Sequence, residues 1–262
     1  MLWKRPFRAS GPGRPFPHNK KTEGTTDPAM MTYEEFKSMV HLSRREICKE
    51  IFNENKDLIK VKKPERVVKN LGKIFEATLA LSNKKGFHAM SLRDLSSGAG
   101  LSMGALYSYF SSKEELLRMI QDQGRRITSR ILEEQIGTVE ATREKLQTAI
   151  VVHLYLSEVM QPWFYFSYME AKNLPKRAQK EAILSELSTE QMYADIIKQG
   201  QREGIFKPRD PEMTSAFIKA MLQDWYLKKW KYQARQVTVD AYGKVVVDWA
   251  FAYLDNQTAM EQ

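Results

Sequence analysis

The chain has 262 residues, enough for two domains that each bury a core, and its formal net charge is +9 at pH 7. Its single cysteine, Cys48, excludes an intramolecular disulfide and a multi-cysteine metal site, so we expect no metal, no cofactor and a reducing compartment such as the cytoplasm. No run of about eighteen apolar residues is present, so no membrane partner is expected.

The excess positive charge is confined to the first part of the chain. Residues 1–113 hold 21 Lys and Arg against 11 Asp and Glu, whereas residues 114–262 hold 20 against 21. A block of like charge attracts polyanions, and DNA is the obvious partner. The alternative is a solvated basic face that keeps the protein soluble.

The N-terminal residues divide into a tail and a helix. Residues 1–29 are rich in Pro, Gly and basic side chains and lack the apolar core of a signal peptide, which predicts a disordered basic tail able to lie along DNA phosphates. Residues 30–57 are predicted to form one extra amphipathic helix, because Thr32 and Glu35 make a capping box and apolar residues recur from Phe36 onward.

The glycines of "SSGAGLSMGALYSYF" suit the corner between two helices better than a phosphate-binding loop. A dinucleotide loop needs G-x-G-x-x-G after a strand, but its third glycine is missing and the preceding apolar spacing is helical. Ser91 and Asp94 form a capping box, Gly100 can end that helix, and Ser102 can cap the next. The pattern predicts a helix-turn-helix motif over residues 91–110.

A further helix precedes this motif and completes a three-helix domain over residues 58–117. Basic residues surround Pro64, and Ile74, Ala77 and Leu81 then share one helix face. Gly86 follows two lysines and ends the helix.

Residues 118–262 are expected to be helical throughout, with an unusual aromatic segment. In "MQPWFYFSYME" too many rings follow one another to face a single core, so some are expected to line a cavity for a small apolar ligand. The alternative is that the rings only pack between helix layers. The candidate ligand-binding residues are His153, Tyr155, Trp163, Phe164, Phe166 and Tyr168.

Two other classes of protein fit the sequence less well. The four histidines are scattered, and no H-E-x-x-H or G-x-S-x-G motif is present, so catalysis is not indicated. An architectural DNA-binding protein without a ligand is the second alternative, but such a protein does not require a neutral, aromatic-rich second half.

The segment Ile74–Leu117 closely resembles the DNA-binding domain of the TetR family of transcriptional regulators. The resemblance rests on "KKGF", "LRDL", "AGLS", "LYSYF" and "SKEEL", which occur in this order. It implies an all-α protein in which a three-helix helix-turn-helix domain precedes a helical ligand-binding and dimerisation domain. It also implies a bacterial, nucleoid-associated repressor that a small effector molecule releases from a palindromic operator in double-stranded DNA.

The resemblance implies DNA contacts at positions that match the family's motif. Arg93 is expected to reach a guanine edge, whereas Met103 and Ala105 can contact a thymine methyl group. Tyr107 and Tyr109 are expected to offer hydroxyls to phosphates, and Lys113 to offer its charge. The full set of expected DNA-binding residues is Ser91, Arg93, Ser102, Met103, Ala105, Tyr107, Tyr109 and Lys113.

The family's last two helices form a four-helix bundle with a second subunit, which implies a homodimer. The matching candidates are Ala216, Ala220, Gln223, Val246, Trp249 and Ala252, although the same residues can instead fill the core of one chain. The C-terminal stretch "LQDWYLKKWKYQARQVTVDAY" resembles TetR-type regulators of fatty-acid or acyl-CoA metabolism. This second resemblance implies an acyl-CoA-like effector.

Overall fold

The computed structural model describes residues 30–40, 44–174 and 176–255, and the tail predicted for residues 1–29 lies outside them. Throughout these residues the secondary structure is helical, with one isolated bridge between Phe206 and Asp255 and no strand. The predicted all-α class is therefore confirmed. We find in this part of the chain no helix that combines the length and hydropathy of a membrane span.

The first helical segment is divided, so the prediction of a single helix over residues 30–57 is wrong. Helix α1 (Tyr33–Met39) begins at the predicted Thr32 and Glu35 capping box and ends at Val40, whose backbone is extended. Helix α2 (Arg44–Glu54) follows separately. The reason is packing, because the buried residue Phe36 of α1 joins one hydrophobic core whereas the buried residues Cys48 and Ile51 of α2 join another.

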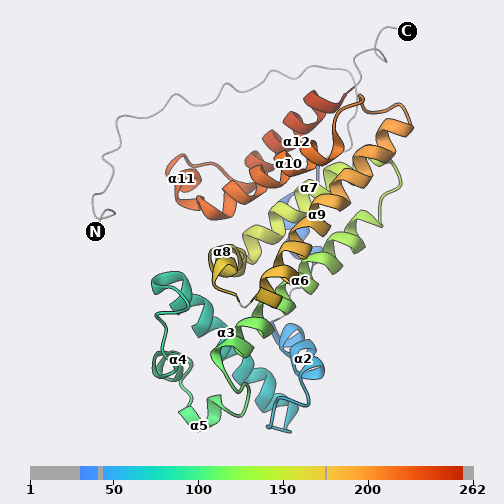
Figure 1. Ribbon diagram of the computed structural model, residues 1–262. Coiled ribbons are helices and arrows are strands. Elements are labelled where there is room, and N and C mark those ends of the chain that lie inside the picture. The colour runs from blue at the N-terminus through green and yellow to red at the C-terminus, as the bar shows by residue number, and fades with distance from the viewer. Residues whose placement is uncertain (1–29, 41–43, 175, 256–262) are drawn as a thin grey trace.

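Helices α3 (Pro64–Lys85), α4 (Leu92–Ala99) and α5 (Met103–Leu106) pack around one of these cores. Leu71 and Ile74 of α3 meet Leu95 of α4 and Leu106 of α5 there. Helix α3 starts with a proline in its first turn and ends at Gly86, where φ is +85°. The helices α2 to α5 lie together in the lower part of Figure 1.

Helix α6 (Lys113–Ile136) connects the two cores. Its first half buries Leu116 and Ile120 in the core of the helix-turn-helix region, whereas Ile127 and Ile131 enter the second core. Helix α2 is held against α6 by Glu50, which pairs with Arg130 over 2.7 Å. One continuous helix thus joins the two cores.

The second core is built around α7, which contacts α1, α6, α8, α9, α10 and α12. All of its residues from Ala149 to Ser157 are buried, because these helices pack against it. The elements of this region are α7 (Thr142–Val159), α8 (Gln161–Glu170), the 3-10 turn η1 (Ala171–Asn173), α9 (Lys176–Arg202), α10 (Pro211–Leu227), α11 (Lys229–Ala234) and α12 (Val239–Leu254).

Candidate functional site

The helix-turn-helix forms through local signals that were predicted from the sequence. The Ser91 hydroxyl accepts from the Asp94 amide, and the Asp94 carboxylate accepts from the Ser91 amide over 2.8 Å. Gly100 adopts the left-handed conformation at φ +62°, which a residue with a Cβ atom rarely takes. Ser102 caps α5 by accepting from the Ala105 amide at 3.2 Å.

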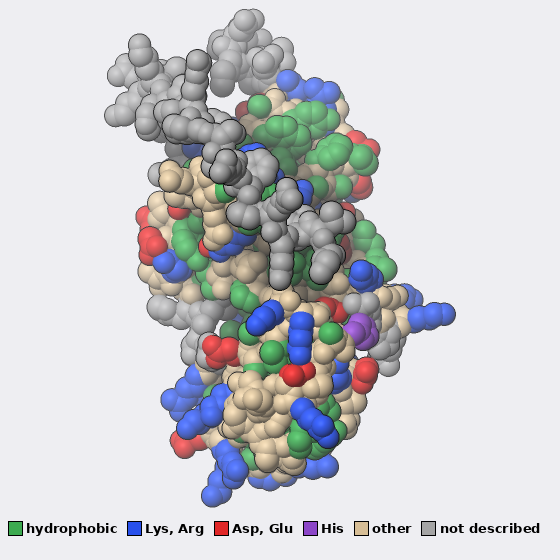
Figure 2. Space-filling model, turned by 90° about the vertical axis from the view of Figure 1, so that its left-hand side faces the viewer, with side chains coloured by type: hydrophobic (Ala, Val, Ile, Leu, Met, Phe, Trp, Pro, Cys, Tyr) green, Lys and Arg blue, Asp and Glu red, His purple; other side chains and the backbone are tan. Residues whose placement is uncertain are grey.

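The predicted base-reading residues lie at the surface or half-buried. Ser91, Arg93 and Ser102 are exposed, whereas Met103 and Ala105 are half-buried. Figure 2 shows Lys and Arg side chains around the lower part of the molecule, where α3 to α5 lie. The surface of α4 and α5 therefore presents exposed polar side chains and a half-buried apolar edge, and basic side chains surround it.

The two tyrosines of "LYSYF" have different environments. Tyr107 is 44% exposed, so its hydroxyl is available to a phosphate. Tyr109 is 1% exposed, and its hydroxyl accepts a hydrogen bond of 2.8 Å from Asn70 Nδ2 on α3. The prediction that Tyr109 contacts phosphate is wrong, because its ring belongs to the core between α3 and α5.

Lys113 holds the connection between α3 and α4. Its Nζ donates to the carbonyl oxygens of Phe87 at 2.8 Å, His88 at 3.2 Å and Met90 at 2.7 Å. Burial lowers the pKa of this ammonium group, and nearby glutamates oppose the shift. A phosphate contact of the kind predicted for Lys113 would therefore compete with three existing hydrogen bonds.

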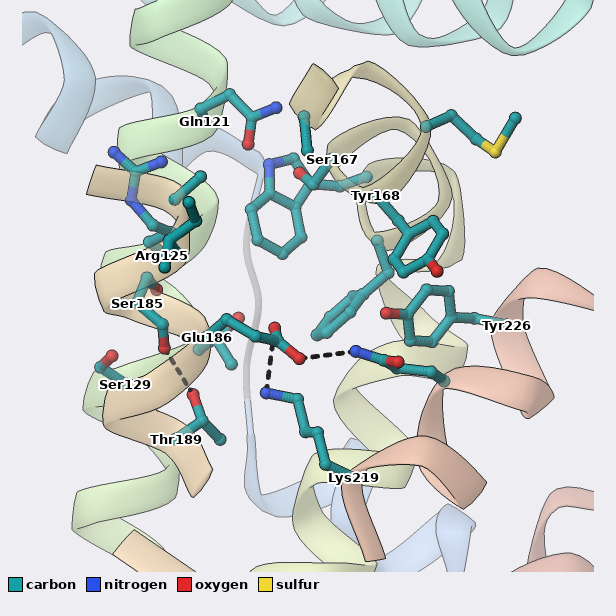
Figure 3. A pocket seen from close by; sticks show the side chains of 18 of the residues that line it. Gln121, Arg125, Ser129, Ser167, Tyr168, Ser185, Glu186, Thr189, Lys219 and Tyr226 are labelled. Atoms are coloured by element: carbon teal, nitrogen blue, oxygen red, sulfur yellow. Dashed lines mark hydrogen bonds and ion pairs between the residues drawn. The ribbon is translucent and has the colours of Figure 1, made fainter. Parts of the chain in front are cut away.

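A cavity of about 770 Å³ lies among α6, α7, α8, α9 and α10 (Figure 3). Four of the six predicted ligand residues line it: His153, Trp163, Phe164 and Tyr168. These four side chains therefore face a cavity in addition to packing between helices. The cavity is lined mainly by apolar groups, as ligand pockets usually are.

Tyr155 and Phe166 are not in this cavity, so their predicted role as ligand contacts is wrong. Tyr155 is fully buried beside α1, where its hydroxyl donates to Asp240 at 2.7 Å. Phe166 points to the other side of α8 and packs edge-on against Phe87, with 5.9 Å between ring centroids. Successive aromatic residues of α8 thus face different cores, as expected for neighbours on a helix.

One end of the cavity carries a polar cluster that was not predicted from the sequence, and within it Lys219 is buried whereas Glu186 is partly exposed. Lys219 Nζ lies 3.2 Å from the Glu186 carboxylate, to which Gln223 Nε2 also donates at 2.6 Å. Burial and the charge of Lys219 lower the pKa of His153, whose Nδ1 is 2.9 Å from the Tyr193 hydroxyl. His153 is accordingly neutral at pH 7.

Most polar groups in the wall come from helices that carry no recognisable motif. Gln121 and Arg125 lie on α6, and Glu186 lies on α9. Each is one of many polar residues in an amphipathic helix. No spacing in the sequence therefore distinguishes it from a residue on the solvent-facing side. The one sequence clue was Lys219, a lysine between apolar residues on the buried side of α10.

The surface of α10 and α12 carries exposed apolar side chains at helical spacing. Among the predicted interface residues, Ala220, Trp249 and Ala252 are exposed and Ala216 is half-buried. Val246 is 1% exposed within the chain's own core, so placing it in a dimer interface is wrong. Gln223 is half-buried and lines the cavity. Met213, Phe217, Val245 and Tyr253, which the sequence analysis did not single out, are further exposed apolar side chains on the same two helices.

A three-helix helix-turn-helix region joined to a larger helical domain is the architecture of a class of DNA-binding regulators. Two family models match the chain: "Bacterial regulatory proteins, tetR family" over residues 74–120, and "Tetracyclin repressor-like, C-terminal domain" over residues 139–251. The chain belongs to the TetR family of transcriptional regulators.

Two related regulators are similar to this chain in sequence. The HTH-type transcriptional repressor KstR2 of Mycobacterium tuberculosis is 28% identical over 188 residues, covering 66% of this chain and 86% of that protein. The HTH-type transcriptional regulator PksA of Bacillus subtilis is 29% identical over 143 residues, covering 50% of this chain and 68% of that protein.

Solved structures share the fold. The ketosteroid transcriptional regulator KstR2 of Mycobacterium tuberculosis superposes with a TM-score of 0.61 at 22% identity, covering 71% of this chain and 95% of that one. The regulator FadR of Bacillus subtilis, solved in complex with stearoyl-CoA, superposes with a TM-score of 0.55 at 17% identity, covering 68% of this chain and 96% of that one.

Proposed function

We propose that this protein is a homodimeric transcriptional repressor that binds a palindromic operator and is released from it by a small apolar molecule. The exposed edge of α4 and α5 would enter the major groove, with Arg93 reading a base and Tyr107 meeting a phosphate. The named relatives include repressors, which supports repression over activation.

The main support for this proposal is helix α8, because it contacts both the cavity and the helix-turn-helix region. Trp163, Phe164 and Tyr168 line the cavity. On the other side of the same helix, Glu170 accepts from the amide of Phe87 at 2.9 Å, and Phe87 lies in the connection between α3 and α4. A ligand that displaces α8 would therefore move the segment that leads into the DNA-binding motif.

Release follows from linkage between the two sites. A ligand weakens operator binding only if it binds the conformation that cannot reach both major grooves more tightly than the one that can. The continuous helix α6 supplies the second connection, since it runs from the helix-turn-helix region to the cavity wall at Gln121 and Arg125. Coupling of this kind is usually about 5- to 150-fold in affinity.

The effector we propose is a long-chain acyl compound, either free or as a CoA thioester. The size and aromatic lining of the cavity support an elongated apolar ligand. FadR, which shares the fold, was solved with stearoyl-CoA, and KstR2 is described as a ketosteroid regulator. The stearoyl chain of the one and the steroid skeleton named for the other are both apolar.

The competing architectural role is less well supported, because a DNA-binding scaffold needs no cavity next to its DNA-binding region. An experiment separates the two. Random double-stranded DNA is selected on the purified full-length protein, and the enriched sequence is tested with acyl compounds. The proposal predicts one palindrome whose half-sites lie about 34–36 Å apart and whose binding an acyl compound weakens. Enrichment of no sequence would contradict it.

A further inference from the structure

Two buried polar atoms in the cavity wall have no hydrogen-bond partner in the described part of the chain. They are Nε2 of Gln121 and Oγ of Ser167. Gln121 is only 4% exposed, so bulk water does not reach its side chain freely. Because an unpaired buried donor is costly, these atoms mark a place where another molecule supplies the acceptor.

Both atoms belong to the same end of the cavity. The Trp163 indole Nε1 donates at 3.0 Å to the carbonyl of Ile120, the residue before Gln121. Ser167 lies one helical turn after Trp163 on α8. Figure 3 shows Gln121 and Ser167 at one end of the cavity and Lys219 toward the other. A ligand group that reaches this end meets donors from α6 and from α8.

The charges around the cavity favour an uncharged group. Arg125 already pairs with Asp122, and Lys219 pairs with Glu186. Lys172, a further cation of the lining, is exposed to solvent. A carboxylate buried near Gln121 would lose its hydration without gaining an unpaired cation, whereas a neutral carbonyl oxygen has little hydration to lose.

We propose that this end of the cavity is a carbonyl-binding subsite. Gln121 Nε2 and Ser167 Oγ donate to the oxygen of an uncharged ketone, ester or thioester, and Trp163 and Phe164 pack against the apolar remainder. The assignment rests on the proposed ligand-binding function and narrows it, because it selects a neutral acyl derivative or ketone over a free fatty acid.

The test compares probes of equal chain length on the full-length protein: a methyl ketone, a methyl ester, a methyl thioester, a free acid and an alkane. Binding is measured by isothermal titration calorimetry. We expect the three carbonyl compounds to bind about tenfold more tightly than the alkane, which corresponds to about 1.4 kcal/mol, and the free acid to bind no more tightly than the ketone.

Two variants test whether Gln121 Nε2 and Ser167 Oγ cause the tighter binding of the carbonyl compounds. In Gln121→Leu and Ser167→Ala the advantage of the ketone over the alkane should shrink, while binding of the alkane stays within about twofold. Thr189→Val is the matched control. Thr189 lines the same cavity, but its hydroxyl already donates to the Ser185 carbonyl at 3.1 Å. In this variant the ketone should therefore keep its full advantage in affinity over the alkane.

Each outcome has one meaning. If the ketone and the alkane bind the wild-type protein equally, only water satisfies these atoms and the subsite is refuted, although ligand binding by the cavity stands. If the free acid binds most tightly, the site recognises anions and the proposal is also overturned. If no probe binds, the proposed ligand function fails with it. Should Gln121→Leu not fold, as judged by circular dichroism, Ser167→Ala carries the same comparison.

Discussion

Tyr109 joins the first and third helices of the DNA-binding region through one buried hydrogen bond to Asn70. In Tyr109→Phe the ring still fills the core, but Asn70 Nδ2 loses its acceptor. We expect the free energy of unfolding to fall by about 1–3 kcal/mol, measured by urea denaturation. Tyr107→Phe is the control, because that hydroxyl is exposed and its loss should leave stability unchanged. Equal effects of the two changes would contradict this assignment.

His153 makes the stability of the ligand domain sensitive to acid. Its pKa lies well below 6.5 in the folded state because of burial and Lys219, whereas the unfolded chain binds a proton near pH 6.5. The unfolded state therefore binds more protons as the pH falls through about 6.5, and stability is lost in that direction.

The comparison is between wild type and His153→Gln, which cannot titrate. Below pH 6.5 the free energy of unfolding of the wild type should fall relative to the variant by about 1.4 kcal/mol per pH unit. Denaturation at a series of pH values measures the difference. Parallel profiles for the two proteins would show that His153 is not held neutral.

At the scale of elements, Gly124 of α6 allows α8 to lie close. A Cβ atom at this position would be 1.8 Å from the Trp163 ring, so a side chain there must displace the indole. We expect Gly124→Ala to cost about 1–3 kcal/mol of stability and to change the fluorescence of Trp163. Gly104→Ala, where nothing lies within 4 Å, is the control and should not destabilise the fold. If Gly124→Ala changes neither the stability nor the fluorescence of Trp163, α6 and α8 are not in tight contact.

The helix-turn-helix elements could be predicted from the sequence because their signals are local. The Ser91 and Asp94 capping box and the conformation of Gly100 depend on residues within a few positions. The end of α1 at Val40 could not be predicted in this way. Its cause is the packing of Phe36 and Ile51 into different cores, and a repeating apolar pattern does not show which core a residue will join.

The candidate ligand site was predictable only in part for the same reason. An aromatic run on α8 is visible in the sequence, and it led to Trp163, Phe164 and Tyr168. Their partners Gln121 and Glu186 come from α6 and α9, and only the tertiary fold brings them together. Tyr155 was misassigned because its polar partner, Asp240, is 85 residues away.

At the scale of the whole molecule, the exposed apolar face of α10 and α12 is the surface through which we expect two chains to associate. Phe217 on α10 is 50% exposed, so Phe217→Glu should leave each chain folded but place a charge in the apolar interface. We expect a folded monomer in analytical ultracentrifugation and weak operator binding, since a monomer reaches one half-site.

The control is Val246→Asp, which should unfold the chain instead, because Val246 is 1% exposed in its own core. A Phe217→Glu protein that remains dimeric would remove this face from the interface. Loss of folding in that variant, seen by circular dichroism, would contradict the exposure of Phe217.

The central claim is that the cavity and the operator compete through one conformational change. The most direct test is the affinity of the full-length dimer for its selected operator at fixed salt, with and without a saturating long-chain acyl thioester, while calorimetry reports occupancy of the cavity. We predict that operator affinity falls by about 5- to 150-fold and that the operator weakens thioester binding by the same factor. Unchanged operator affinity with the cavity occupied would contradict the account.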